Sequence, residues 1–232
     1  MTLFSNKWFL GVVLCLSTQF ANAQDWPNLK RFQEENGKLA APAANEKRVV
    51  FMGNSITEGW KNTSPEFFNG RPYINRGISG QTTPQMLIRF HQDVVNLKPK
   101  VVVMLCGIND IAGNSGPSTL EMIEDNIAAM AEIAKANKIS VVLSSVLPAF
   151  DFPWKPGLEP ANKVIALNQW IKEYASAHKL VYLDYFSAMK DERNGLPKSL
   201  AGDGIHPNKA GYAIMEPLAE KAIAVAMKKK MK

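Results

Sequence analysis

Two residues near the end of the chain have the types and spacing that proton transfer requires. His206 follows Asp203 by three positions and stands directly before Pro207, in the stretch AGDGIHPNKAGY at residues 201–212. On one turn, the Asp203 carboxylate can accept a hydrogen bond from Nδ1 of His206 and leave Nε2 to act as a base. We expect Pro207 to occupy the first position of a final helix, where its missing N–H costs little. A base of this kind needs a nucleophile elsewhere in the chain.

Candidate partners follow apolar runs that are typical of buried strands. Ser55 follows such a run in FMGNSITEGW, Gly80 lies in INRGISGQTTP and Asn109 lies in MLCGINDIAG. Each has an ordinary alternative role, because serine caps helices, glycine forms turns and asparagine bonds its own loop. The Gly-x-Ser-x-Gly elbow of α/β-hydrolases is absent, since Thr57 occupies the position of the second glycine.

The alternation of strand and helix patterns predicts how these residues are brought together. Five short runs have the near-continuous apolarity of strands covered on both faces: RVVFM, PYINR, KVVVML, SVVLSSVL and LVYLDY. Helical patterns lie at 84–97, 119–137, 162–178 and from 207 into the tail. This order predicts an α/β fold, a three-layer α/β/α sandwich with a central five-stranded parallel sheet. Ligands of such sheets bind at the carboxyl ends of the strands, where Ser55 and Asn109 stand.

Taken together and in this order, the blocks resemble the SGNH family of serine hydrolases, also called GDSL-type esterases. The family signature of Ser, Gly, Asn and His matches Ser55 in GNSIT, Gly80 in SGQTT, Asn109 in GIND and His206 in DGIHP, where Asp203 comes three residues earlier. The resemblance covers residues 51–211 and implies the flavodoxin-like SGNH hydrolase fold. It also implies a carboxylic ester hydrolase.

The resemblance implies a role for each matched residue. Ser55, His206 and Asp203 would form the catalytic triad. The oxyanion hole would consist of the backbone N–H groups of Ser55 and Gly80 and the side-chain amide of Asn109. One departure is Asn54, which stands where the family usually has aspartate. Because the two side chains are nearly isosteric, we expect altered local hydrogen bonding and no loss of chemistry.

The first 23 residues have the pattern of a secretory signal peptide. Lys7 precedes the apolar run WFLGVVLCL, and ANA at 21–23 forms a small-residue cleavage pattern. The run is shorter than the roughly 20 apolar residues that span a bilayer, so we expect cleavage near Ala23, export to the periplasm or the medium, and no stable membrane anchor. Residues 24–46 are expected to form an N-terminal helix and lead-in loop, and 47–232 the SGNH hydrolase domain. Of the two cysteines, Cys15 lies in the signal peptide and Cys106 stands alone, so no internal disulfide is expected.

Composition limits the other classes of function. The net charge is +6, and four lysines lie in the terminal KKKMK, which we interpret as a solvated tail without a nucleic-acid partner. No Gly-x-x-x-x-Gly-Lys loop is present, which disfavours a nucleotide-binding flavodoxin-like domain. His91 and His178 fall within helical patterns and are assigned structural roles, so we expect neither a zinc site nor a cofactor.

The expected substrate is a small-molecule or glycan ester. The proline-rich stretch LPAFDFPWKPGLEP at 147–160 carries Phe150 and Trp154, which we expect to contact substrate together with Trp60, although core packing is an equal alternative. The blocks look most like bacterial acylhydrolases similar to the platelet-activating-factor acetylhydrolase catalytic subunit, and like carbohydrate acetylesterases. With export, this favours short acyl esters, acetyl above all, on carbohydrate. The alternatives are a lipid-directed acylhydrolase, lysophospholipase or thioesterase, and a noncatalytic glycan-binding protein. The oligomeric state is not predicted.

Overall fold

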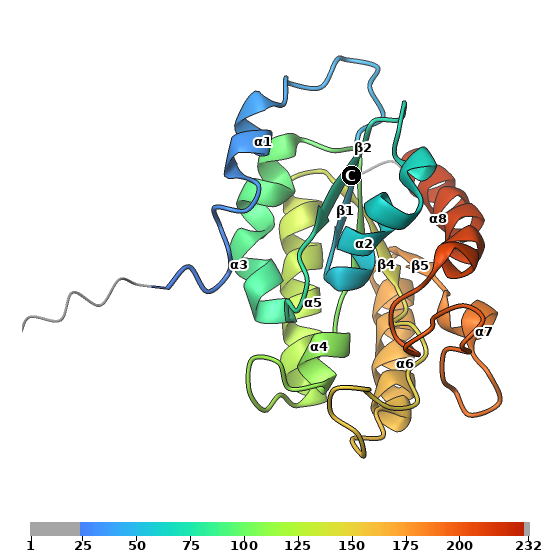
Figure 1. Ribbon diagram of the computed structural model, residues 1–232. Coiled ribbons are helices and arrows are strands. Elements are labelled where there is room, and N and C mark those ends of the chain that lie inside the picture. Colours follow the sequence, from blue (N-terminus) through green and yellow to red (C-terminus); the bar gives the residue numbers. More distant parts are fainter. Residues whose placement is uncertain (1–23, 230–232) are drawn as a thin grey trace, which may run out of the picture.

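A five-stranded parallel sheet forms the centre of the molecule (Figure 1). The computed structural model describes residues 24–229, so the expected signal peptide lies outside the described residues. The strand order is β2-β1-β3-β4-β5, and all neighbouring pairs are parallel. The strands are β1 (Val49–Gly53), β2 (Tyr73–Gly77), β3 (Val101–Leu105), β4 (Ser140–Ser144) and β5 (Val181–Leu183). The predicted fold class is confirmed.

Helices cover both faces of the sheet because side chains alternate along each strand. Val50 and Met52 of β1 pack into one core, whose helices are α3 (Thr83–Asp93), α5 (Leu120–Ala136) and α6 (Ala161–Ala177). Val49 and Phe51 pack into the other, with α2 (Ser55–Thr63), α7 (Phe186–Met189) and α8 (Lys209–Lys228). The three inner strands β1, β3 and β4 are thus buried on both sides, as their apolar sequences predict, whereas the edge strands β2 and β5 are partly exposed.

Short elements complete the chain. The helix α1 (Gln33–Lys38) lies against α3, and α4 (Ile108–Ile111) follows β3 directly. Two 3₁₀ turns, η1 (Pro65–Phe67) and η2 (Val95–Leu97), follow α2 and α3. Among residues 24–229, no helix is both long enough and apolar enough to cross a membrane.

Two expected helix boundaries differ from the structure. The final helix begins at Lys209, because the Asn208 side chain caps it by accepting a hydrogen bond from the Gly211 N–H at 3.1 Å. Pro207 therefore precedes the helix and does not occupy its first position. The N-terminal helix is confined to Gln33–Lys38, and none of its residues is buried. So short a helix has little tertiary packing to extend it.

Candidate active site

The end of β1 places Ser55 at the carboxyl edge of the sheet. The strand ends at Gly53, Asn54 caps the following helix by accepting from the Ile56 N–H at 3.0 Å, and Ser55 is the first residue of α2. A Cβ on Gly53 would lie only 2.0 Å from Oγ1 of Thr57, so glycine lets the helix begin directly against the strand. The Ser55 N–H, in the first turn of the helix, has no intrahelical acceptor and can donate to a substrate oxygen.

The structure brings Ser55, His206 and Asp203 into one hydrogen-bonded chain. Oγ of Ser55 lies 3.0 Å from Nε2 of His206, although 151 positions separate the two residues. Nδ1 of the same ring lies 2.6 Å from Oδ2 of Asp203. The other carboxylate oxygen, Oδ1, accepts from the backbone N–H groups of Ile205 at 2.9 Å and His206 at 2.8 Å. The tight turn thus orients both the carboxylate and the ring.

Opposing effects set the charge of Asp203. Desolvation raises its pKa, but the hydrogen bonds from the His206 side chain and from the backbone N–H groups of His206 and Ile205 lower it, and the net pKa lies below its ordinary value. The carboxylate is therefore ionised at neutral pH. The side chains of His206 and Asp203 are 41% and 39% exposed, so water screens the pair and its main contribution is orientation.

Gly80 and Asn109 are the other two residues expected to supply oxyanion donors. Gly80 has φ +77°, a conformation that favours glycine, and no atom lies within 4 Å of the position a Cβ would take. The N–H groups of Ser55 and Gly80 donate to no backbone or side-chain acceptor among residues 24–229. Asn109 is buried in α4, and its Nδ2 donates to the carbonyl oxygen of Gln81 at 2.9 Å. Since an amide nitrogen carries two hydrogens, one remains for a ligand.

A buried arginine behind this edge connects the loops that carry these donors. Arg89 of α3 has no exposed surface and donates from Nε to the Gln81 side chain at 2.6 Å. Its Nη2 donates to the carbonyl oxygens of Gly53 at 3.0 Å and Arg76 at 2.9 Å, and its Nη1 pairs with Asp93 at 3.1 Å. Burial lowers the pKa of Arg89 to about 10, so it stays charged at neutral pH. The arginine thus fixes the ends of β1 and β2 relative to the Gly80 loop.

Arg89 was not among the residues predicted to form the site. The available signal was an arginine between Met86 and Phe90, two apolar residues of the buried helix face, with an aspartate four positions later at Asp93. A second buried contact fixes α4, because Asp110 accepts from the Thr83 N–H at 2.9 Å and from its hydroxyl at 2.6 Å. Burial raises the pKa of Asp110.

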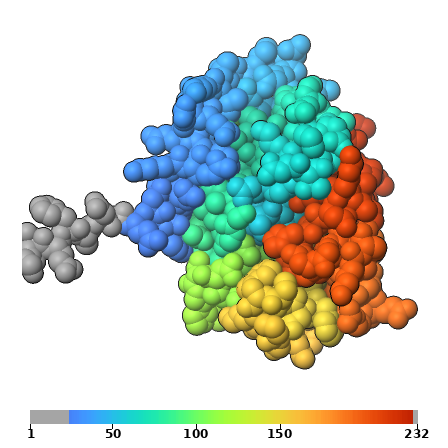
Figure 2. Space-filling model, in the orientation of Figure 1, coloured from blue at the N-terminus to red at the C-terminus, as the bar shows by residue number. Residues whose placement is uncertain are grey.

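The loop after β4 places Trp154 beside His206. Phe152 is buried and anchors the loop in the core, while Trp154 is 49% exposed and its ring centroid lies 6.0 Å from that of His206. Asp151 accepts hydrogen bonds from the N–H groups of Phe152 at 2.9 Å and Gly157 at 2.8 Å, which holds the loop closed. Figure 2 shows this yellow segment against the red segment that leads into α8.

Phe150 lies in the same loop. It lines a groove of about 390 Å³ beside Asp203, and the Arg193 guanidinium lies 4.6 Å from its ring centroid. The side chain is 43% exposed. Phe150 and Trp154 thus both lie at the edge of the sheet that carries Ser55.

The structure corrects the expectation that Trp60 contacts substrate. Trp60 is 2% exposed, its ring stacks with Phe67 and Tyr212, and its Nε1 donates to Glu216 at 3.2 Å. Five residues after Ser55 in a helix with 3.6 residues per turn, it points away from the serine and into the core between α2 and α8. Trp60 is a core residue.

The other two histidines lie far from this chain of contacts in the sequence and belong to other elements. His91 is in the last turn of α3, and His178 caps α6, where its ring stacks on Tyr174 with centroids 4.1 Å apart. Within the described part of the chain, no three His, Cys, Asp or Glu side chains are grouped so as to hold a metal ion.

Comparisons with known proteins identify the family of the chain. The family model of the GDSL-like lipases and acylhydrolases matches residues 51–214. The crystal structure of a GDSL-like lipase from Bacteroides thetaiotaomicron is 50% identical with a TM-score of 0.84, over 86% of this chain and 98% of that one. An acetylxylan esterase from Geobacillus stearothermophilus is 25% identical over 61% of this chain and 67% of its own length. Another, from Xylanibacter ruminicola, is 26% identical over 80% of this chain but only 45% of its own length.

The chain belongs to the GDSL-like lipase/acylhydrolase family. It is an ester-hydrolysing enzyme, as the order of the sequence blocks predicts.

Proposed function

We propose that this enzyme removes short acyl groups, acetyl above all, from carbohydrate, with Ser55 as nucleophile, His206 as base and Asp203 as the residue that orients the base. The observation that carries the proposal is the unbroken chain from Oγ of Ser55 to Nε2 at 3.0 Å and from Nδ1 to Oδ2 of Asp203 at 2.6 Å. Both distances are within the range in which a proton can be transferred or held.

In the proposed reaction, Oγ of Ser55 attacks the ester carbonyl carbon while Nε2 of His206 takes the hydroxyl proton. The N–H groups of Ser55 and Gly80 and the free amide hydrogen of Asn109 stabilise the oxyanion. The bond between the carbonyl carbon and the sugar oxygen then breaks, and His206 gives its proton to that oxygen, which leaves as the sugar hydroxyl. Water, deprotonated by the same ring, attacks the acyl-serine, which releases the acid and restores Ser55.

Two observations support a sugar ester as the substrate. The exposed indole of Trp154, next to His206, offers a flat surface on which a sugar ring can stack. Two relatives are acetylxylan esterases. We therefore infer that the sugar lies against Trp154 and the acetyl carbonyl lies at Ser55.

The test compares wild-type protein with the Ser55→Ala variant for acetate release from acetylated xylan. Ser176→Ala, an exposed serine of α6, is the matched control. Ser55→Ala should lower turnover on the order of 10⁴-fold or more and keep the far-ultraviolet circular dichroism spectrum, whereas the control should retain full activity. A folded Ser55→Ala variant with normal turnover would overturn the assignment.

Two further measurements separate the alternatives. A series of p-nitrophenyl esters should show the highest kcat/KM for acetate, and a maximum at long acyl chains would favour a lipid-directed acylhydrolase or thioesterase. A serine-directed phosphonate should label one serine per chain at Ser55, and absence of labelling would favour a noncatalytic glycan-binding protein.

We also propose that the protein is exported and that residues 1–23 are removed. When the full sequence is expressed in a bacterial host, the intact mass of the exported protein should correspond to a chain beginning at Gln24. A mass that includes residues 1–23 would contradict this.

A further inference from the structure

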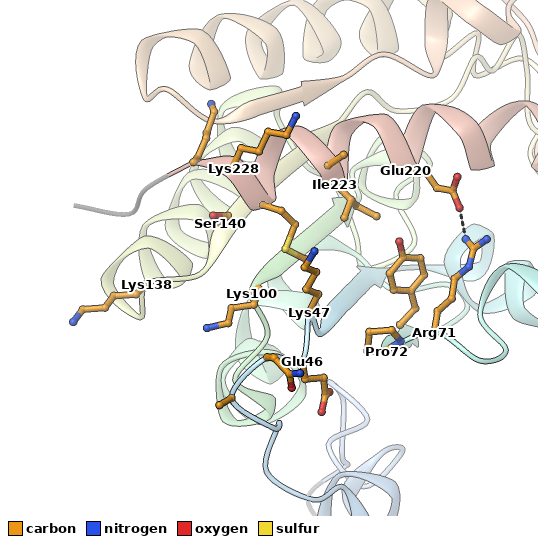
Figure 3. A pocket seen from close by; sticks show the side chains of 16 residues that line it. Glu46, Lys47, Arg71, Pro72, Lys100, Lys138, Ser140, Glu220, Ile223 and Lys228 are labelled. Carbon is orange, nitrogen blue, oxygen red and sulfur yellow. Dashed lines mark hydrogen bonds and ion pairs between the residues drawn. The ribbon is translucent and has the colours of Figure 1, made fainter.

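A basic groove lies at the amino ends of the strands (Figure 3). Ser55 follows the carboxyl end of β1, so it lies at the opposite edge of the sheet. The volume of the groove is about 840 Å³, and α8, the start of β2 and the segment before β1 form its walls. Six cationic side chains line it: Lys47, Arg71, Lys100, Lys138, Lys228 and Lys229. We call this hollow the amino-edge groove.

The positive charge of the amino-edge groove is largely uncompensated. Its two carboxylates already have partners, because Glu46 pairs with Arg48 at 2.7 Å and Glu220 pairs with Arg71. By contrast, none of the five lysines makes an ion pair with any residue in the range 24–229, and only Lys229 has hydrogen-bond acceptors, the carbonyl oxygens of Lys179 and Leu180. Like charges gathered in a concave surface strengthen the local field and attract anions.

The charged surface continues beyond this groove. A second hollow of about 610 Å³ shares Lys100 and Lys138 with it and adds Lys98, Asn96 and Asn137. The two hollows therefore form a strip of cationic and amide side chains from α8 to the turn before β3. An elongated polyanion would contact more of this strip than a compact anion could.

We propose that the amino-edge groove binds an acidic polysaccharide, a glycan that bears carboxylates along its length, and so retains the polymer on which the esterase acts. The proposal rests on the proposed function in one respect, that the bound polymer is the substrate of the esterase. The binding itself does not require catalysis. A five-residue strand spans about 16 Å, so the groove and Ser55 are separated by at least this distance and only a long polymer can reach both.

The shape of the groove favours a glycan over the other large polyanions. Single-stranded nucleic acid is held by aromatic rings on which bases stack. The one aromatic side chain in the lining, Tyr73, is half-buried and packs against Phe51 and Phe67, with ring centroids 5.4 and 5.5 Å apart. A membrane surface is bound by an apolar face that protrudes into the lipid. Here the larger apolar side chains of the lining are recessed, since Ile223 is 4% exposed and Met227 is partly buried.

The test measures binding of polygalacturonate to the wild-type mature chain and to the double variant Lys100→Glu/Lys138→Glu. Both lysines are exposed and unpaired with acids within the described residues, so the fold should persist. Lys61→Glu/Lys172→Glu makes the same charge change at exposed positions of α2 and α6 and is the matched control. The groove variant should bind at least about tenfold more weakly at low salt, since each lysine near an anionic membrane surface contributes roughly fivefold and a polyanion attracts lysines by the same charge effect. The control should lose less than about twofold.

Activity on p-nitrophenyl acetate distinguishes the groove from the active site. Both double variants should hydrolyse this small ester at the wild-type rate, while the groove variant alone should show a raised KM on a long acetylated acidic polymer. Equal polygalacturonate binding by the two variants would overturn the proposal. Tighter wild-type binding to phosphatidylglycerol vesicles or to single-stranded DNA would also overturn it. If the wild-type protein binds polygalacturonate but cleaves no acetyl ester, the proposed function fails and the groove assignment stands.

Discussion

Replacing Asp203 by asparagine separates the two effects that a carboxylate can have on His206. The asparagine keeps an oxygen that can accept from the backbone N–H groups of Ile205 and His206, so the turn should persist. Its amide nitrogen then faces Nδ1 in place of the carboxylate oxygen at 2.6 Å. A donor at that position favours the ring tautomer with its proton on Nε2. That proton faces Oγ of Ser55, so the ring can no longer accept the serine proton.

The expected loss can be divided between charge and tautomer. The side chains of Asp203 and His206 are 39% and 41% exposed, so the lost charge attraction is worth on the order of 1 kcal/mol, or about fivefold in rate. The wrong tautomer has a larger effect, on the order of 10⁴-fold in the trypsin-type triad. We expect kcat to fall by roughly 10³-fold to 10⁴-fold with KM nearly unchanged, because the substrate contacts remain.

The assay combines kinetics on p-nitrophenyl acetate with nitrogen NMR of protein labelled at histidine. The sequence has only three histidines, so His91 and His178 serve as internal references. Asp191→Asn is the matched control, since Asp191 also accepts backbone hydrogen bonds, from Arg193 and Gly195, but does not contact His206. An Asp203→Asn variant that keeps its kcat within tenfold of wild type, or keeps the proton on Nδ1, would refute the reasoning.

Four other outcomes are expected. Asn109→Ala should lower kcat by about 10²-fold to 10³-fold by removing one oxyanion donor, and unchanged kinetics would exclude it from the hole. Arg89→Met should lower the free energy of unfolding, measured in urea, by about 3–5 kcal/mol. The variant leaves the buried Asp93 carboxylate and the carbonyl oxygens bound by Arg89 without the guanidinium that pairs with them. A change below about 1 kcal/mol would contradict that network. The folded-state pKa of Asp203 is lowered, so its stabilising contribution is present above an unfolded pKa of about 3.9 and is lost as the pH falls through the folded value. Acid titrations of the wild type and of Asp203→Asn, followed by circular dichroism, should therefore differ above about pH 4 and converge below it. Burial raises the pKa of the Cys106 thiol, so Ellman's reagent should modify it only after unfolding, and rapid reaction of the folded mature chain would contradict its burial.

Local sequence patterns were sufficient to predict the layered architecture. The apolar runs of RVVFM and KVVVML fill both cores because their side chains alternate between two covered faces, and the strands they form are parallel neighbours. Since parallel strands end at one edge, the residues directly after them had to share it. Asn54, in place of the usual family aspartate, still caps α2 through its oxygen, while its amide nitrogen has no partner among the described residues.

The aromatic residues show where such patterns stop being informative. Trp60 and Trp154 both follow strands that end at the edge carrying Ser55, and although prolines surround only Trp154, neither stretch states which ring is buried. Trp60 lies on the face of α2 that α8 covers, and Trp154 lies on a loop that the buried ring of Phe152 anchors beside His206. Which of them meets solvent depends on contacts with segments about 50 to 150 positions away, which periodicity does not encode.

Sequence alone determined which residues follow the strands, because alternation and helical spacing depend only on neighbouring positions. Tertiary structure alone decided which distant groups meet. Arg89 holds two strand ends through carbonyl oxygens that every residue possesses, so no residue type marks its partners in the sequence. The lysines of the amino-edge groove come from separate segments, and they form one charged surface only because parallel strands also begin at one edge.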